Sequence, residues 1–356
     1  MLRTIEIREV DQLQSYRLPW TSLWRGGRQP TFTQSLDWLA AYVSLQSDRV
    51  ALRALLVRDD DELLGIVPLV LMTESTRHGP LRALRYPLLE DLGCCGPIGT
   101  QPTFVLLEAM QYLMRHHEEW DVLDLAGIDV EGIDHGRTKT ALHVARIEAE
   151  VAAWQTRHVV GLRTPEETKR LIARIDQLPQ RNTSFEYVRY RPEGAMHGDA
   201  EPRLELFDDC DAIAAAGDRA AESHLLGNAL LRELHEVAAK NGTLDVNVLY
   251  LDDQPAAFVY GYVCDDCVTV VDAGLDPRFA PDHADQALMA EMLEDSLNRG
   301  DRLIDCGTNP PRWLKPWCNG THSLHRAQST RPSGLVAQTL RWGRALRRRF
   351  GDVSTH

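Results

Sequence analysis

The sequence lacks long hydrophobic runs, a cysteine framework and an excess of positive charge. Its apolar stretches, such as residues 63–72, fall short of the roughly 18 residues that a membrane span needs, and the first residues alternate apolar and charged side chains instead of forming a secretory signal. Seven cysteines are an odd set, too sparse for a disulfide scaffold, which indicates a reducing compartment. The net charge of −13 argues against broad binding to nucleic acid, which needs Lys and Arg. We therefore expect a cytoplasmic protein.

The composition is that of a globular protein with more than one core. The chain has 356 residues, of which 44% are hydrophobic and 26% are charged. Domains average roughly 150 residues, so the length predicts two of them. We expect an N-terminal domain at 1–160, a C-terminal domain at 161–334 and a basic tail at 335–356.

One order of elements occurs twice, at residues 50–128 and 244–309. Each copy reads as a strand, an acidic turn, a second strand, a third strand, an amphipathic helix and a closing strand, and the third strand of the first copy is expected at 92–99. A helix precedes each copy, at 36–43 after the N-cap Ser35 and at 225–240. The pattern predicts an internal duplication, and ligands preferentially bind in the cleft between such domains.

Further elements are expected around the second copy. The sequence predicts a helix at 165–178, strands at 185–190 and 203–207, and a C-terminal helix at 335–350 with a basic face. Such a helix either contacts an anionic membrane or complements its own dipole against an acidic body, and the second interpretation is favoured. The CxxC at 264–267 is interpreted as a hairpin turn, since no second CxxC completes a zinc site.

Several short phrases carry a family resemblance. Ser35-Leu-Asp-Trp-Leu39, Leu64-Gly-Ile-Val-Pro-Leu69, Asp276-Pro-Arg-Phe279 and Trp313-Leu-Lys-Pro-Trp317 occur in the element order described above. In this order the chain resembles the tandem-GNAT proteins known as BioF2-like or CelD-like acetyltransferases, relatives of the FemAB-type peptidyltransferases, from about residue 30 to 320. The resemblance implies an α/β (α+β) fold of two GNAT-like domains in tandem, each a mixed, mainly antiparallel sheet flanked by helices.

The resemblance also implies transfer of an acyl group to an amine bound in the interdomain cleft. The donor would be an acyl-CoA thioester such as acetyl-CoA or, in the FemAB branch, an aminoacyl-tRNA; the acidic composition favours CoA. In a GNAT module two strands splay apart around the thioester arm, and the pyrophosphate meets the N-terminus of the next helix. Here this maps to the strand at 268–275, the loop at 276–284 and the helix at 285–299. The implied donor-binding residues are Val270, Val271, Ala273, Arg278, His283, Ala284 and Gln286.

The phosphate loop departs from the family pattern. Where the family usually has a glycine, this chain has Ala280-Pro-Asp-His-Ala-Asp285. Asp282 and Asp285 are good helix caps, but their charge repels phosphate. This leaves two alternatives open beside acyl-CoA transfer: a different donor, or a binding or scaffold protein that has lost catalysis.

Candidate catalytic and substrate residues lie at the ends of the strands. Asp272 interrupts an apolar run and is either a general base for the attacking amine or a structural aspartate. The resemblance places a lysine at Lys315, which would hold an anionic group or polarise the acyl carbonyl; it is otherwise a surface lysine. The acceptor would be an amine on a small molecule, glycan or lipid. Glu90 and Asp91 either bind it or form a solvated turn, with the turn slightly favoured, and Trp313 and Trp317 either wall its pocket or close the core.

Other polar residues are assigned no chemistry. Asp124 and Asp305 end the closing strands of the two copies, which favours a repeated supporting role. His283, His322 and His325 lack the spacing of metal ligands with carboxylates on a shared face, so we expect no metal.

Overall fold

The computed structural model describes residues 2–76, 79–89, 92–93, 95–162, 164–173, 185–217 and 229–330. Glu90, Asp91 and the predicted basic helix at 335–350 lie outside these ranges. The chain divides into two compact units. Unit 1 consists of residues 1–28, 34–155 and 323–356, and unit 2 of residues 29–33 and 156–322.

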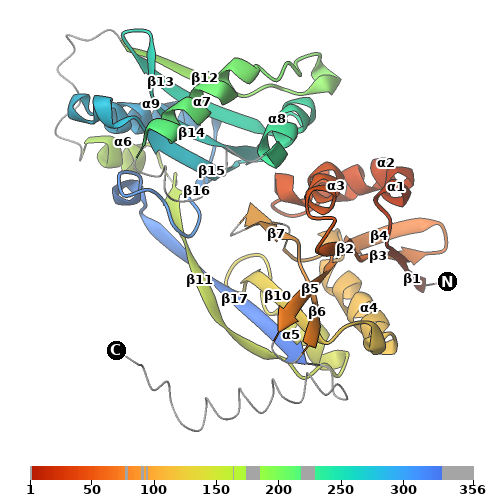
Figure 1. The fold of residues 1–356 in the computed structure, drawn as a ribbon. Helices are drawn as coiled ribbons and strands as arrows, with labels where there is room; N and C mark the ends of the chain where they lie inside the picture. Colours follow the sequence, from red (N-terminus) through yellow and green to blue (C-terminus); the bar gives the residue numbers. More distant parts are fainter. Residues whose placement is uncertain are drawn as a thin grey trace. The chain divides into compact units, whose positions relative to one another are not determined.

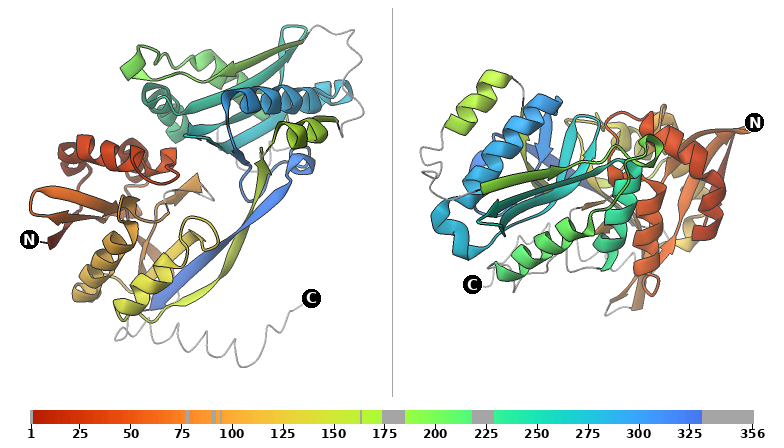
Figure 2. Two further views of the ribbon diagram at one scale, coloured as in Figure 1. Left: turned by 180° about the vertical axis from the view of Figure 1, so that it is seen from behind. Right: turned by 90° about the horizontal axis from the view of Figure 1, so that it is seen from above.

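Unit 1 begins with the strand β1 and a set of helices, and beside the two-stranded sheet β7-β8 it contains strands of two larger sheets (Figure 1). One sheet has the strand order β1-β3-β4-β9, and the strands of the other follow the order β17-β10-β6-β5-β2. Helices α1 to α3 cover one face of the β3–β4 hairpin and α4 covers the other (Figures 1 and 2). The helices are α1 Val10–Leu13, α2 Arg17–Arg25, α3 Leu36–Leu45, α4 Pro102–Arg115 and α5 Arg137–Val144. The strands are β1 Leu2–Ile7, β2 Val50–Leu52, β3 Ala54–Asp59, β4 Glu62–Val67, β5 Val70–Thr76, β6 Gly79–Arg85, β7 Leu88–Leu89, β8 Leu92–Gly93, β9 Ile98–Gly99 and β10 Val122–Asp129, with β17 Gly320–Thr330 returning from unit 2.

Unit 2 is built on one twisted sheet with the strand order β12-β13-β14-β15-β16-β11. Its helices are α6 Pro165–Ala173, α7 Leu204–Ala216, α8 Ala229–Asn241 and α9 Ala284–Arg299. Its strands are β11 Glu150–Gly161, β12 Phe185–Tyr190, β13 Leu244–Leu251, β14 Gln254–Cys264, β15 Cys267–Leu275 and β16 Leu303–Asp305. Short 3₁₀ helices are η1 Gln14–Tyr16, η2 Phe32–Gln34, η3 His117–Glu119, η4 Ala195–His197, η6 Pro277–Asp282 and η7 Lys315–Trp317.

Adjacent side chains on β14 show which helices cover which face of this sheet. Val259 packs in a core cluster with Leu288 and Met292 of α9. The ring of the next residue, Tyr260, lies 5.8 Å from that of Phe207 on α7. Since neighbouring side chains on a strand point to opposite faces, α9 covers one face and α7 the other.

The acidic turns of both copies contain aspartate in the left-handed backbone conformation. Asp60 joins β3 to β4 with φ 49°, and Asp252 and Asp253 join β13 to β14 with φ 49° and 61°. Aspartate tolerates this left-handed conformation better than most residues, and two-residue hairpin turns require it. The acidic residues that mark the two copies in the sequence therefore lie at hairpin turns in the structure. The CxxC segment is a third turn of this kind, with Asp265 at φ 51° between β14 and β15, which confirms the hairpin prediction.

Two predicted strands are wrong. The third strand of the first copy was expected at 92–99, but these residues form only the short pieces β8 and β9. The long partner of β5 is β6, paired from Val70↔Arg85 to Thr76↔Gly79. Residues 203–207 were expected to be a strand and instead begin α7, whose buried face follows the helical spacing of Leu206, Cys210 and Ile213.

Each closing strand carries a buried aspartate that pairs with an arginine of a neighbouring antiparallel strand. Asp124 of β10 faces Gln328 of β17 and binds the guanidinium of Arg326, two residues before Gln328. Asp305 of β16 faces Val159 of β11 and accepts a 2.5 Å hydrogen bond from Arg157, again two residues before. The duplication thus repeats a strand-to-strand ion pair, which accounts for both aspartates structurally.

Candidate functional site

The candidate donor site in unit 2 lies where β15 and β16 stop pairing. These parallel strands pair from Cys267↔Leu303 to Thr269↔Asp305, where β16 ends, while β15 continues to Leu275. From Val270 onward β15 keeps only β14 as its ladder partner among the described strands. Its other backbone edge is therefore available to a ligand that carries amide groups.

A β-bulge shapes this part of β15. Gly261 pairs with Val270 and Tyr260 pairs with Asp272, so Val271 has no opposite residue. Bulges bend a strand, increase its twist and re-aim side chains. Val270 and Ala273 pack in the core cluster that contains α9, so their role toward a donor would be through the backbone.

Asp272 lies on the other face of the strand. It is 8% exposed and its Oδ1 accepts a 2.8 Å hydrogen bond from the backbone N–H of Ala273. Burial raises the pKa of the Cys210 thiol on α7, and the charges of nearby aspartates, Asp272 among them, add to this rise. The carboxylate is thus placed on the side of the sheet opposite to α9. Its role as general base remains a prediction.

The loop that leads to α9 is held by its own aspartate. Asp276 caps η6 through Oδ1, which accepts from the N–H of Arg278 at 2.9 Å, and its carboxylate also binds the Arg278 guanidinium, with Nη2 at 2.6 Å. This hydrogen bonding lowers the pKa of Asp276. Arg278, one of the implied phosphate contacts, is therefore already paired, although its side chain is 68% exposed.

The N-terminus of α9 combines favourable and unfavourable features for a phosphate. His283 adopts φ 55° directly before the helix, and the first helical turn directs backbone N–H groups outward with the positive end of the dipole. Burial raises the pKa of Asp285, although backbone hydrogen bonds at Asp285 and Gln286 act in the other direction. Asp282 is exposed and precedes the helix.

The turn after β16 places Lys315 at the surface. Leu314 and Trp317 are buried at 1% and 3% exposure, and Trp313 packs beside them against the core of unit 2. The N–H of Lys315 donates to the carbonyl of Pro311 at 3.1 Å. Lys315 is exposed and forms no ion pair within the described ranges. The tryptophans therefore support the turn, and the lysine side chain is available to a ligand.

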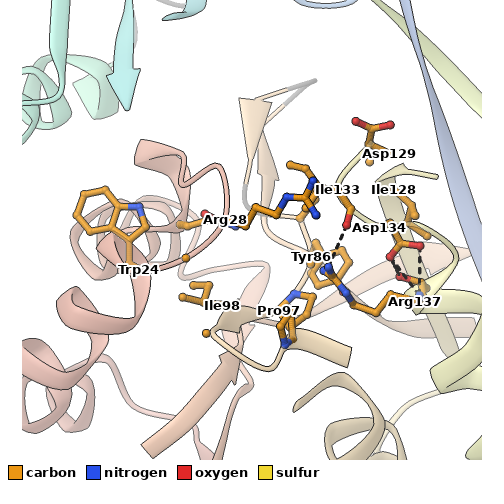
Figure 3. A pocket seen from close by; sticks show the side chains of 18 residues that line it. Trp24, Arg28, Tyr86, Pro97, Ile98, Ile128, Asp129, Ile133, Asp134 and Arg137 are labelled. Carbon is orange, nitrogen blue, oxygen red and sulfur yellow. Dashed lines mark hydrogen bonds between the residues drawn. The ribbon is translucent and has the colours of Figure 1, made fainter. Parts of the chain in front are cut away.

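A separate pocket of about 90 Å³ lies in unit 1 (Figure 3). Arg28, after α2, and Arg137, at the start of α5, point into it from two sides, with Tyr86 between them. Arg137 donates from Nη2 to the carbonyl of Ile133 at 2.9 Å, while its buried Nε has no hydrogen-bond partner. Asp134 accepts from the hydroxyl of Thr138 at 2.6 Å.

Neither arginine was predicted from the sequence, because the pocket is assembled from distant segments. Its wall comes from the end of α2, the turn before α4, the end of β10 and the start of α5. Glu90 and Asp91, the predicted acceptor contacts, lie outside the described residues.

Part of unit 2 matches a known domain family. Residues 188–314 match the acetyltransferase (GNAT) domain family, so they form a GNAT acetyltransferase domain. The match spans β12 to the turn before Lys315 and includes the diverging strands and α9. Unit 2 thus contains a GNAT domain, and the predicted α/β fold of tandem GNAT-like domains is confirmed.

Solved structures show the same fold over almost the whole chain. The structure is similar to that of FemX, with a TM-score of 0.60, 9% identity and coverage of 96% of this chain and 99% of FemX. It is also similar to a conserved protein of unknown function from Bacteroides thetaiotaomicron, with a TM-score of 0.53, 13% identity and coverage of 93% and 100%. The C-terminal domain of a putative lysylphosphatidylglycerol synthetase from Agrobacterium fabrum gives a TM-score of 0.50, 10% identity and coverage of 94% and 96%. At these identities the likeness concerns the fold.

No curated protein sequence matches the chain significantly. Within the described part of the chain, no helix is both long and apolar enough to cross a bilayer.

Proposed function

We propose that this protein transfers an acyl group from an acyl-CoA thioester, such as acetyl-CoA, to an amine, and that unit 2 binds the donor. The observation that supports this most strongly is the divergence of β15 and β16 after the pair Thr269↔Asp305. It leaves one backbone edge of β15 accessible. The same strand leads into η6 and then to the N-terminus of α9. An extended donor with amide groups at one end and phosphates at the other matches this order of sites.

The reaction needs two contributions from the chain. The attacking amine must be uncharged, and Asp272 is the proposed acceptor of its proton, directly or through a water molecule. Negative charge develops on the acyl oxygen as the amine adds, and the ammonium of Lys315 would stabilise it. The bound CoA leaves as a thiol or thiolate once the amide bond forms.

The acceptor is proposed to be an amine on a small molecule, glycan or lipid, and its position between the domains remains a prediction. A cytoplasmic location is proposed as well, because that is where acyl-CoA is available. The alternative donor is an aminoacyl-tRNA.

Calorimetry with the full chain tests the donor. Acetyl-CoA and longer acyl-CoAs are titrated in separate runs, with desulfo-CoA and 3′,5′-ADP as controls for the two ends of the molecule. Binding of acyl-CoA supports the proposal. Absence of binding at millimolar acyl-CoA, together with aminoacyl transfer from a charged tRNA, would replace it with the alternative donor.

A further inference from the structure

The pocket of unit 1 shown in Figure 3 lies where β10 loses a strand partner. The strand β6 pairs with β10 up to Asp124↔Arg85 and ends there. The chain leaves the sheet at Tyr86, while β10 continues to Asp129, and both Tyr86 and residues 127–129 line the pocket. Further wall comes from β9, a strand of the other large sheet, and from the first residue of α4. The pocket is therefore bordered by strands of two different sheets.

Two arginines direct their guanidinium groups into this pocket. Arg28 follows α2 and is exposed, and Arg137 is the first residue of α5. Within the part of the chain that the structure describes, neither arginine forms an ion pair. Nη2 of Arg137 donates to the carbonyl of Ile133 at 2.9 Å, but its buried Nε has no hydrogen-bond partner. Since a buried N–H without an acceptor destabilises the fold, a ligand oxygen at this atom would be favourable.

The two carboxylates in the pocket wall are engaged within the segment 129–138. Both oxygens of Asp134 accept from the N–H of Thr138, at 3.1 and 3.2 Å, and Oδ1 also accepts from the Thr138 hydroxyl at 2.6 Å. Oδ1 of Asp129 accepts from the N–H of Gly132 at 2.8 Å, and in Figure 3 this carboxylate points away from the guanidinium groups. The carboxylates therefore stabilise their own loop and do not pair with the arginines.

The size and the remaining wall of the pocket restrict its ligand. The volume is about 90 Å³, several times what one water molecule requires, so the pocket accommodates a group of the size of a carboxylate or a phosphate. Trp24, Pro97, Ile98 and Ile128 add apolar wall, and hydrogen bonds to charged groups are stronger in such surroundings than in water. Two unpaired guanidinium groups repel a cation. The pocket therefore favours a small anion.

We propose that this pocket of unit 1 binds a small molecule through an oxyanion group, a carboxylate or a phosphate, held between the guanidinium groups of Arg28 and Arg137. The Nε–H of Arg137 donates to the oxyanion, and Arg28 binds it from the other side of the pocket. A planar guanidinium matches two oxygens of either group. The site goes beyond the proposed acyl transfer, since it uses none of the residues assigned to the donor.

Calorimetry with the full chain tests the site. Sodium phosphate and sodium succinate are titrated in separate runs at constant ionic strength, and the tighter of the two identifies the oxyanion. We expect Arg28→Gln and Arg137→Gln each to weaken binding by roughly tenfold or more, the effect of losing one charge-assisted hydrogen bond. Arg115→Gln, at the exposed end of α4 and outside the pocket, controls for loss of positive charge and should bind as the wild type does. Absence of binding of both anions at millimolar concentration, or equal affinity in all three variants, would overturn the proposal.

Hydrogen–deuterium exchange locates the bound anion, which is needed because the N-terminus of α9 in unit 2 also attracts phosphate. We expect the tighter anion to slow exchange of the amides in residues 127–138 of the wild type and of Arg115→Gln, and not of Arg28→Gln. Arg28 is exposed, so this variant should fold even if Arg137→Gln does not. Protection confined to α9 would assign the anion to the donor site and overturn the proposal. Failure of acyl-CoA to bind would count against the proposed function and leave protection of 127–138 unchanged.

Discussion

Single residues decide whether the proposed donor site is chemically competent. Lys315 stands on a rigid base of buried Leu314 and Trp317, while its own side chain is exposed. Asp272 is the opposite case, a carboxylate that is nearly buried and hydrogen-bonded to its own strand. Two candidates that look similar in a sequence thus differ in how easily they can be removed without harming the fold.

Replacement of Lys315 by alanine tests its role in transfer. We expect kcat/KM to fall by roughly tenfold or more, because a positioned cation near the developing oxyanion is lost. Thermal unfolding should be unchanged, since the side chain is exposed. Lys240→Ala on α8, a surface lysine beside Glu236, is the control for loss of positive charge. Equal kinetics of both variants would remove Lys315 from the site.

Asp285 tests the phosphate end of the donor site. Asp285→Asn keeps a side-chain oxygen for the first-turn amides and removes any residual negative charge. We expect CoA affinity to rise by a few-fold, in line with the roughly 0.3–1 kcal/mol typical of charges at helix ends. Asp282→Asn, at an exposed position before the helix, should have a smaller effect. Weaker CoA binding in Asp285→Asn would contradict this placement of the phosphates.

At the scale of elements, the sequence predicted what depends on local signals. The α3 helix is confirmed at Leu36–Leu45, with the Ser35 hydroxyl accepting from the N–H of Trp38 at 3.1 Å. The strand β12 and the turns of both copies are also confirmed. The third strand of the first copy failed because β6 contains Arg82 and Arg85 among its apolar residues, and Arg82 is held by Asp121 from a distant segment. An ion pair between residues far apart in the chain leaves no mark in the local pattern of apolar and polar residues.

The predicted strand at 203–207 failed for a related reason. Alternation over five residues suggested a strand, but the helical spacing of buried residues extends through Ile213. Tertiary packing on β14 and β15 decides between the two periods. The Asp124–Arg326 and Asp305–Arg157 pairs could be anticipated only on the aspartate side, since the arginines lie on other strands.

A buried charge network secures β12 in unit 2. Arg189 is bonded to Asp245 at 2.7 Å and to Asp295 at 3.0 Å, and Arg191 reaches Asp301 at 2.9 Å. Burial acts to raise the pKa of Asp245, but the two arginines outweigh it and hold this pKa below its usual range.

Stability should therefore depend on pH through Asp245. A carboxyl with a lowered folded-state pKa contributes stability above its unfolded pKa of about 4, and this is lost as the pH falls through the folded value. We expect Asp245→Asn to lower the unfolding free energy by roughly 3–5 kcal/mol, because two buried arginines lose the one carboxylate that binds both of them. Urea titrations at pH 7 and pH 3 measure this. A wild-type advantage that is as large at the lower pH would contradict the assignment.

At the scale of the whole molecule, the two units share an order of elements but differ in their candidate sites. Unit 2 contains the diverging strands, the Lys315 turn and the residues that match the GNAT family. Unit 1 contains a small pocket between Arg28 and Arg137. The duplicated order of elements was readable from the sequence, whereas the pocket was not, because its residues meet only after folding.

The central claim is that the backbone edge of β15 from Val270 to Leu275, where β16 no longer pairs with it, binds an acyl-CoA. The most direct test follows the backbone amides of Val270 to Leu275 by hydrogen–deuterium exchange, with and without saturating acetyl-CoA. The account predicts slower exchange at these amides and at the start of α9, and unchanged exchange in β3 and β4. Calorimetric binding without protection of this strand, or protection confined to unit 1, would contradict it.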